Sequence, residues 1–240
     1  MEARTRRARD RSGHWRRRAE NVRDAFGLVL LLVLTTYVLA SVVSDRGWSA
    51  VLIAITTTAT AVVALTSSHA PPTLVRRSIL FAALAILLAI ASAAFGGHTF
   101  LNIASFIIMV LLAVSMGAVL QRVVTSGSVS SRTILGAISV YASLGLLFTW
   151  AYGLIDRVEG GEFFGDGVST ATGDFIFFSY TTLTTTGYGD LVPSGQVGRM
   201  VSGLEMMLGQ IFLVTLVAGL VSLWRPGEGL LRRRERRETS

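Results

Sequence analysis

The chain has 240 residues, of which 51% are hydrophobic and 15% charged, with a net charge of +7 and no cysteine. Its charged residues gather at the two ends and at a few short joints, which is the distribution of an integral membrane protein. The basic balance alone would fit a nucleic-acid partner, but no nucleic-acid-binding fold accompanies it. No metal cluster, nucleophile pair or phosphate loop indicates an enzyme.

Residues 1–25 form a basic segment that precedes the first apolar run. Nine arginines lie there, and five more lie at residues 232–237, so the positive-inside rule predicts that both termini are cytoplasmic. A second apolar run follows the first after a very short turn, which favours a retained anchor over a cleaved signal peptide. The arginines would either contact anionic lipid, at about 1 kcal/mol per charge, or serve only as topology determinants.

Six apolar segments are long enough, with their neighbours, to cross a bilayer, which agrees with two cytoplasmic termini. They run over residues 26–43, 48–65, 79–95, 100–120, 134–155 and 200–224. The predicted organisation is a basic N-terminal segment (1–25), a four-helix membrane domain (26–121), a cytoplasmic linker (122–133), a pore domain (134–224) and a basic cytoplasmic tail (225–240). Any larger cytoplasmic regulatory domain would have to be a separate chain.

The fourth apolar segment, at residues 101–120, contains no arginine or lysine, and Arg122 lies past its end. Moving one charge through 100 mV releases about 2.3 kcal/mol, and steep voltage gating needs several charges per subunit. A helix without charges has no such coupling to the field. The four-helix domain is therefore expected to lack a voltage sensor.

A polar stretch at residues 153–171 follows the fifth segment and is expected to form an extracellular turret. Thr172 is a candidate N-cap, with Asp174 in the first turn where a negative charge suits the helix dipole. The helix predicted from Gly173 to about Thr184 is too short to cross the membrane. We expect it to dip in and return, an arrangement tolerated where the non-helical backbone lines an ion path.

Residues 184–190 read Thr-Thr-Thr-Gly-Tyr-Gly-Asp, which has the chemistry of a potassium-selective filter. A dehydrated potassium ion needs a cage of oxygens, and rings of backbone carbonyls from four chains can supply it. Gly187 and Gly189 can adopt backbone angles that turn successive carbonyls the same way. Tyr188 would pack outward, and the Thr185 hydroxyl would add an oxygen at the inner mouth. The predicted filter is residues 185–189, and the predicted potassium ligands are Thr185, Thr186, Gly187 and Tyr188.

With its flanking helices, this string makes residues 134–224 resemble the pore domain of the potassium channel superfamily, in its prokaryotic six-transmembrane form. The resemblance implies an all-α integral membrane protein. It would have six transmembrane helices, a re-entrant pore helix and filter, and the topology of voltage-gated channels. One filter loop is a quarter of a pore, so the implied partners are three further copies in a homotetramer. Potassium ions in the filter are the implied cofactor, with no organic cofactor.

In that family, two aromatic residues of the pore helix brace the filter, and Phe177 and Phe178 stand at the matching positions. Neither ring can donate a hydrogen bond, unlike the tryptophans common in the family, so packing and nearby hydroxyls must hold the filter. Thr186 stands where valine or isoleucine is common, but its backbone carbonyl is what the site would use. The predicted supporting residues are Thr184, Asp190, Phe177, Phe178, Tyr180, Thr181, Thr182 and Glu205.

Glu205 is the sole acidic residue inside the predicted spans, which makes it a functional candidate. It would either bond to pore-helix hydroxyls behind the filter or sense protons, and both readings stay open. Gly209 resembles the hinge glycine of prokaryotic inner helices, although a glycine can equally permit close helix packing. The family's spacing implies that the cavity is lined by Gln210, Leu213, Val217 and Val221.

The sequence thus predicts a potassium-selective channel subunit of the plasma membrane that is not strongly voltage-gated. One alternative is the membrane subunit of a potassium-uptake transporter. Such a chain would carry four degenerate filter repeats, whereas this chain has one intact copy. Another alternative is a sensor or scaffold in which the channel fold no longer conducts. A separate cytoplasmic regulatory subunit is compatible with these readings but is not indicated.

Overall fold

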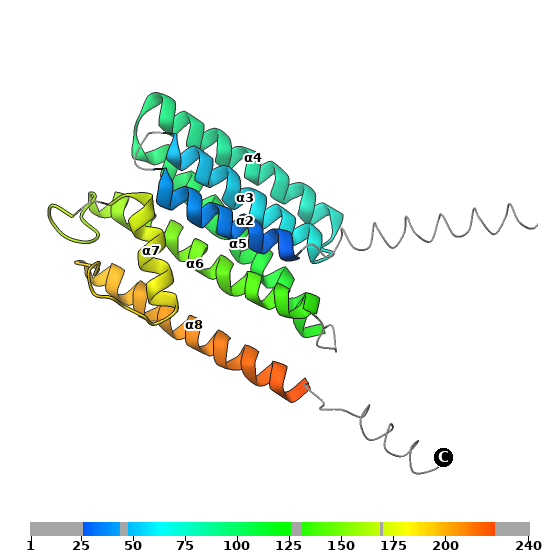
Figure 1. Ribbon diagram of the computed structural model, residues 1–240. Helices are drawn as coiled ribbons and strands as arrows, with labels where there is room; N and C mark the ends of the chain where they lie inside the picture. Colours follow the sequence, from blue (N-terminus) through cyan, green and yellow to red (C-terminus); the bar gives the residue numbers. More distant parts are fainter. Residues whose placement is uncertain (1–25, 44–47, 126–130, 169, 224–240) are drawn as a thin grey trace, which may run out of the picture.

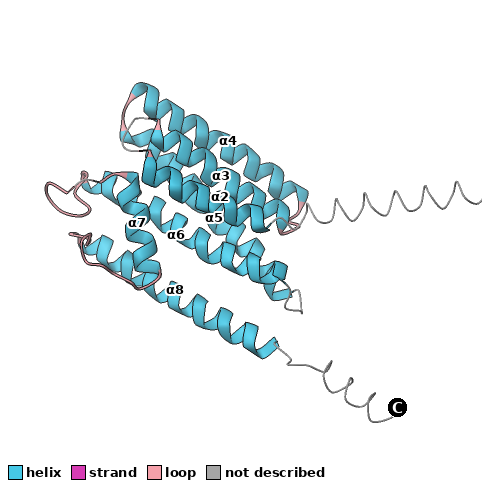
Figure 2. Ribbon diagram, viewed as in Figure 1, coloured by secondary structure: helices cyan, strands magenta, loops and turns pink. Residues whose placement is uncertain are grey.

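The computed structural model describes residues 26–43, 48–125, 131–168 and 170–223, without the side chains at 131–132 and 220–223. Both arginine-rich termini lie outside the described residues. Within the described part of the chain, every regular element is a helix (Figure 2).

Seven helices follow one another along this part of the chain. They are α2 (Phe26–Val42), α3 (Ser49–Ser67), α4 (Pro72–Phe95), α5 (His98–Thr125), α6 (Ser131–Glu159), α7 (Thr172–Leu183) and α8 (Gln196–Leu223). The helices α3, α4, α5, α6 and α8 are long and apolar enough to cross a membrane, whereas α2 has 17 residues and is shorter. Of the six expected crossings, the crossing by α2 stays a prediction.

Several helices extend beyond the apolar runs that predicted them. Helix α4 begins at Pro72, because a proline in the first turn lacks only an N–H that would have no helical partner there. Arg76 and Arg77, which precede the predicted apolar run at residues 79–95, are therefore helical, and His98, which precedes the run at residues 100–120, is the first residue of α5. An apolar run marks the stretch that suits hydrocarbon, while the backbone can stay helical through the polar ends.

Helices α2 to α5 pack together as a four-helix bundle, and α6, α7 and α8 lie beside it (Figure 1). Helix α3 contacts α2, α4 and α5, and the bundle then packs on α6 through α2 and α5. The short helix α7 contacts α2, α6 and α8. Helices α6 and α7 therefore lie directly against the four-helix bundle of the same chain.

Polar side chains join the bundle to α6. The guanidinium of Arg157 donates to Asn102 Oδ1 at 2.8 Å and to Ser105 Oγ at 2.6 Å, both on α5. Trp150 Nε1 donates to Thr57 Oγ1 of α3 at 3.4 Å. Two side chains of α6 thus bond to neighbouring helices of the bundle where hydrocarbon would leave them without partners.

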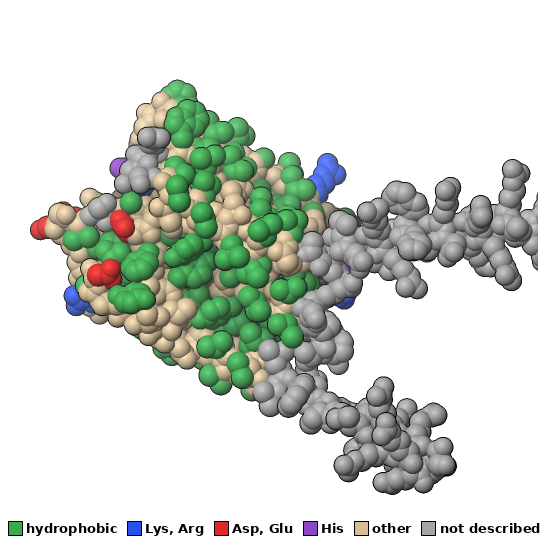
Figure 3. Space-filling model, in the orientation of Figure 1, with side chains coloured by type: hydrophobic (Ala, Val, Ile, Leu, Met, Phe, Trp, Pro, Cys, Tyr) green, Lys and Arg blue, Asp and Glu red, His purple; other side chains and the backbone are tan. Residues whose placement is uncertain are grey.

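The surface fits a membrane environment. On the face drawn in Figure 3, hydrophobic side chains cover the middle of the molecule, and charged side chains gather toward its ends. A surface with so many exposed large hydrophobic side chains would be unusual on a soluble monomer. Together with the long apolar helices, it indicates a membrane protein.

The loop between α6 and α7, expected to be a polar turret, contributes Phe163 and Phe164 to a buried aromatic cluster. This cluster also includes Tyr152, Phe175 and Phe178. Phe163 is fully buried and Phe164 nearly so. The backbone N–H of Phe163 donates to Asp156 Oδ1 at 3.1 Å, and its carbonyl accepts from the backbone N–H of Ser194 at 2.8 Å. The loop is thereby tied to the end of α6 and to the segment that leads into α8.

The close packing of α6 on α7 predicts that a side chain at Gly145 of α6 lowers the stability of the protein. A Cβ added there would lie 2.8 Å from the ring of Tyr180 on α7, whereas one added at Gly117 on α5 would meet nothing within 4 Å. Gly145→Ala should destabilise the protein by about 1–3 kcal/mol through overpacking. Gly117→Ala should be neutral or slightly stabilising, since alanine is the better helix former. Thermal unfolding of both variants in detergent checks this, and equal midpoints would contradict the packing of α7 on α6.

Candidate functional site

The loop from Thr184 to Asp190 leaves the end of α7 and folds back over its last turn. The backbone N–H groups of Thr186 and Gly187 both reach the carbonyl of Thr181, at 2.8 and 3.2 Å, and that of Thr185 reaches Thr182 at 2.9 Å. These bonds use carbonyls that the end of a helix leaves unpaired. The loop is therefore anchored at its start by α7.

The backbone of this loop alternates in handedness. Gly187 and Gly189 have φ angles of +51° and +83°, and Thr185 has a φ of +56°. A β-branched residue in the left-handed region costs on the order of 1–3 kcal/mol and persists only where its surroundings hold it there. The Thr185 hydroxyl accepts from Gln210 Nε2 of α8 at 3.0 Å and donates to the Thr184 carbonyl at 2.7 Å.

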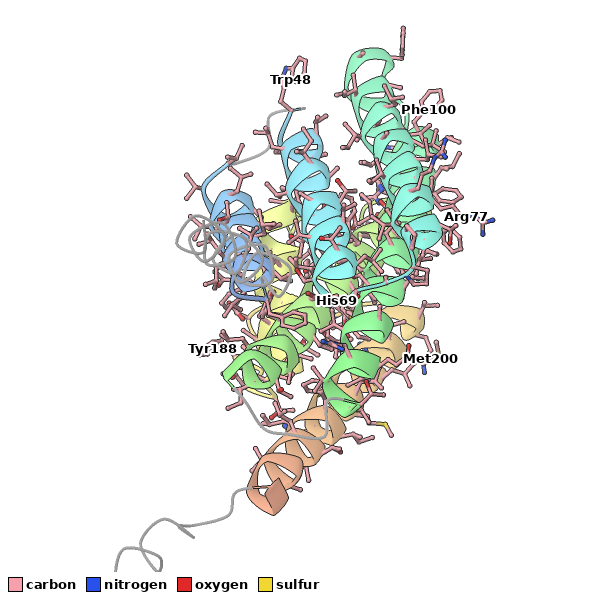
Figure 4. All side chains as sticks on the ribbon, turned by 90° about the vertical axis from the view of Figure 1, so that its right-hand side faces the viewer. Trp48, His69, Arg77, Phe100, Tyr188 and Met200 are labelled. Carbon is pink, nitrogen blue, oxygen red and sulfur yellow. The ribbon has the colours of Figure 1, made fainter. Side chains whose placement is uncertain are left out.

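The loop lies on the surface of the single chain, since every residue from 184 to 190 is exposed. Tyr188 is 71% exposed and stacks on Phe177 of α7, with ring centres 5.9 Å apart and ring planes within 8°. Figure 4 shows Tyr188 at the edge of the molecule. A backbone that is anchored on one side and uncovered on the other is available to other chains or to ions.

Behind the loop, Glu205 of α8 is fully buried between two other helices. Ser179 of α7 donates to its Oε1 at 2.6 Å, and the Tyr152 hydroxyl of α6 donates to its Oε2 at 2.5 Å. Ser179 Oγ also lies 2.8 Å from the carbonyl of Gly145. Ser179 is a hydroxyl of the short helix α7, as expected for a partner of Glu205 from the sequence, whereas Tyr152 of α6 was not expected.

Gly209, one turn beyond Glu205, marks the closest approach of α8 to α7. An added Cβ would lie 2.5 Å from the carbonyl oxygen of Leu183, the last residue of α7. The same oxygen accepts a hydrogen bond from the Tyr141 hydroxyl of α6 at 3.2 Å. The packing role considered for this glycine has a structural basis here, and the hinge role stays a prediction.

The residues expected to line a cavity follow Gly209 along α8. Gln210, Leu213 and Val217 are exposed in the single chain, and the side chain of Val221 lies outside the described residues. Their spacing of three and four residues places them on one face of the helix. Gln210 is the member of this face that reaches the loop.

Not all of the residues expected to brace the loop contact it. Phe177 stacks on Tyr188. Phe178 instead contacts Tyr152, Phe163 and Phe164 in the aromatic cluster. The hydroxyls of Tyr180, Thr181 and Thr184 bond to the backbone carbonyls of Ala142, Phe178 and Tyr180. Thr182 is buried, and Asp190 is exposed.

The start of α7 differs from the expectation. Its N-cap is Ala171, and Asp174 Oδ2 accepts the backbone N–H of Ala171 at 3.1 Å. The predicted cap, Thr172, is instead the first residue of the helix. The prediction was wrong because the carboxylate at the third helical position already satisfies the backbone donor that precedes the helix.

The sequence reading missed the aromatic residues that support this site. Tyr152 and Phe163 are fully buried, and their rings lie 5.2 Å apart. Phe163–Phe164 is an apolar pair inside an otherwise polar stretch, which was a usable signal for a buried anchor. Tyr152 carried no such signal, since its partner Glu205 is 53 residues away in sequence.

Helix α2 also reaches the site. The rings of Tyr37 and Tyr180 meet edge to face with centres 5.4 Å apart. An added Cβ at Gly173, near the start of α7, would lie 3.1 Å from the backbone oxygen of Ala40. The four-helix bundle therefore touches α7 near both of its ends.

In a comparison with known proteins, the part of the chain that contains α6, α7 and α8 matches a protein family. Residues 133–225 match the model of a family described as ion channel. The chain is 35% identical over 82 residues to the "Probable potassium channel protein 2" of Methanocaldococcus jannaschii, which covers 33% of this chain and 21% of that protein. The chain thus spans about a fifth of the length of this curated relative. No solved structure matches the chain. The family match covers about two-fifths of the chain, and this part of the chain is similar to ion channel proteins.

The contacts of Glu205 predict how its substitutions behave. In Glu205→Gln, the amide oxygen can accept from Tyr152 while the amide nitrogen donates to Ser179, so the unfolding midpoint should stay near wild type. Glu205→Ala removes the carboxylate that accepts from the buried Tyr152 hydroxyl, at a cost of about 1–3 kcal/mol, and adds a cavity. Thermal unfolding in detergent distinguishes the two, and an alanine variant as stable as the glutamine variant would refute this role.

Proposed function

We propose that the chain is one subunit of a homotetrameric channel that conducts potassium ions passively. The observation that carries the proposal is the Thr184–Asp190 loop, which combines the filter string with left-handed residues at 185, 187 and 189. Regular alternation of this kind suits carbonyls that all face one axis. In this proposal, the potassium ions are held by the backbone carbonyls of residues 185–188.

The need for four chains follows from the exposure of the loop. Ions are dehydrated only where oxygens surround them, and one loop covers one side of an axis. Helix α8 also has little cover within its own chain, and Met207, Ile211 and Val214 are each 60% exposed or more. Three further copies would complete the ring of loops and cover the part of α8 that faces its neighbours.

In this proposal, Gln210 and Thr185 form the inner entrance of the filter. The 3.0 Å bond between them holds a strained threonine in place and leaves one polar side chain above the apolar Leu213 and Val217. The C-terminal end of α7 points its carbonyls the same way, which favours a cation below the filter. A wet cavity with apolar walls lets ions leave as readily as they enter.

The proposed location is the plasma membrane, with both arginine-rich termini in the cytoplasm. The transporter alternative is disfavoured by the single filter string in the chain. The non-conducting scaffold has no observation in its favour, and ion flux discriminates between it and a channel.

Flux through liposomes tests the proposal. Purified protein should pass potassium and rubidium far better than sodium, and Gly187→Ala should abolish the selective flux because a side chain strains a left-handed position. Gly160→Ala is the matched control, since Gly160 has a φ of +93° in the loop after α6, with open space around its Cβ position. Equal potassium and sodium flux in the wild type would sink the proposal. Selective flux in Gly187→Ala would show that another backbone conducts.

Voltage dependence is a separate prediction. Helix α5 contains Arg122 only in its last turn and no other arginine or lysine. Recordings should therefore lack a steep sigmoidal dependence of open probability on voltage. A voltage sensor would give an effective charge of about ten or more per tetramer, the scale set by three or four charges per subunit. A measured charge of that size would overturn this account of the first four spans.

A further inference from the structure

A concave site lies at the joint between α3 and α4, away from the proposed filter. It has a volume of about 780 Å³, within the range of roughly 300–1,000 Å³ that small-molecule pockets occupy. Its walls come from the end of α3, the following turn and the first turns of α4. In Figure 1 this joint lies at the same end of the molecule as the start of α2.

The chemistry of the walls is that of an amphiphile site. Val75, Ile79 and Leu80 line one side together with two prolines of the turn. Arg76 is the permanent charge of the lining, His69 is its other basic side chain, and no acidic residue is part of it. Ile79 and Leu80 lie three and four residues beyond Arg76, so the three side chains share one face of α4 over about one turn.

The neighbouring arginine serves a different surface. Arg77 is turned by about 100° around the helix from Arg76, and it does not line the pocket. Figure 4 shows its side chain projecting away from α4. Two adjacent arginines, both exposed, therefore differ in one respect, which is whether the charge faces the pocket.

The start of α4 offers little else to an anion. Pro71 and Pro72 have no backbone N–H, and the N–H groups of Leu74 and Val75 already donate to the Pro71 carbonyl. Ile79 and Leu80 are 50% and 64% exposed on a helix that is only sparsely covered by the rest of the chain. The pocket thus combines the positive charge of Arg76 with an apolar helix surface that faces hydrocarbon.

We propose that this pocket binds one anionic phospholipid, with its phosphate at Arg76 and an acyl chain along Val75, Ile79 and Leu80. Basic pockets between transmembrane helices are a known type of lipid headgroup site. The lipid is favoured over a free anion because most of the lining is apolar. It is favoured over a neutral lipid because the lining carries one positive charge and no negative charge. The inference does not depend on ion conduction.

The test compares Arg76→Gln with Arg77→Gln in the full-length protein. Each variant is purified in a neutral detergent and titrated with palmitoyl-oleoyl phosphatidylglycerol or the matching phosphatidylcholine, and bound lipids are counted by native mass spectrometry. The arginine-rich termini are the same in both variants, so they cancel. Wild type and Arg77→Gln should retain phosphatidylglycerol in preference to phosphatidylcholine. Arg76→Gln should weaken that binding at least about fivefold, the equivalent of 1 kcal/mol.

A second variant removes volume instead of charge. Ala70→Phe places a ring in the pocket wall and should weaken phosphatidylglycerol binding while Arg76 is intact. Equal losses in Arg76→Gln and Arg77→Gln would reduce the effect to surface electrostatics, and no loss in either would place the lipid elsewhere. Equal retention of the two lipids by the wild type, or displacement of phosphatidylglycerol by glycerol phosphate, would also overturn the proposal.

Discussion

A buried carboxyl group ties together the three helices on which the candidate site depends. Glu205 of α8 accepts from Ser179 of α7 and Tyr152 of α6, and all three side chains are fully buried. A carboxyl group in an apolar setting is costly unless its oxygens are satisfied, and here both oxygens are. The position of α7, and so of the loop that follows it, depends on this contact.

Two further features also fix the position of α7. Gly209 lets α8 approach the end of α7 to a distance that no larger residue would allow. The ring contacts among Tyr152, Phe163 and Phe178 connect the loop between α6 and α7 to the same site. The site therefore combines one polar bond network, one close backbone approach and one aromatic cluster. The first two hold α8 against α7, and the aromatic cluster packs on Phe175 and Phe178 of α7.

Much of this arrangement could be predicted from the sequence, and the reasons for the rest are physical. Apolar runs predicted the long helices, because a span must be apolar over most of its length. The Thr184–Asp190 string marked the loop, because its glycines are placed at the left-handed positions. Tyr152 and Arg157 could not be assigned, since their partners lie 53 and more than 50 residues away. Phe177 and Phe178 are adjacent in sequence, yet a helix turns successive side chains by about 100°, so they face different neighbours.

The four-helix bundle of α2 to α5 has a clear structural relation to the site. It packs on α6 through Arg157 and Trp150, and α2 reaches α7 through Tyr37. Within one chain, the bundle is thus joined to the helix that carries the proposed filter. A displacement of α2 would reach α7 directly, without passing through α8.

The measurement that tests the central claim most directly is an electron cryo-microscopy structure of the full-length protein in lipid nanodiscs with potassium. The account predicts four copies around one axis, with the loops meeting at the centre. Separate densities should lie on the axis between the carbonyls of residues 185–188. A monomer or dimer, or a tetramer whose loops face lipid away from the axis, would contradict it.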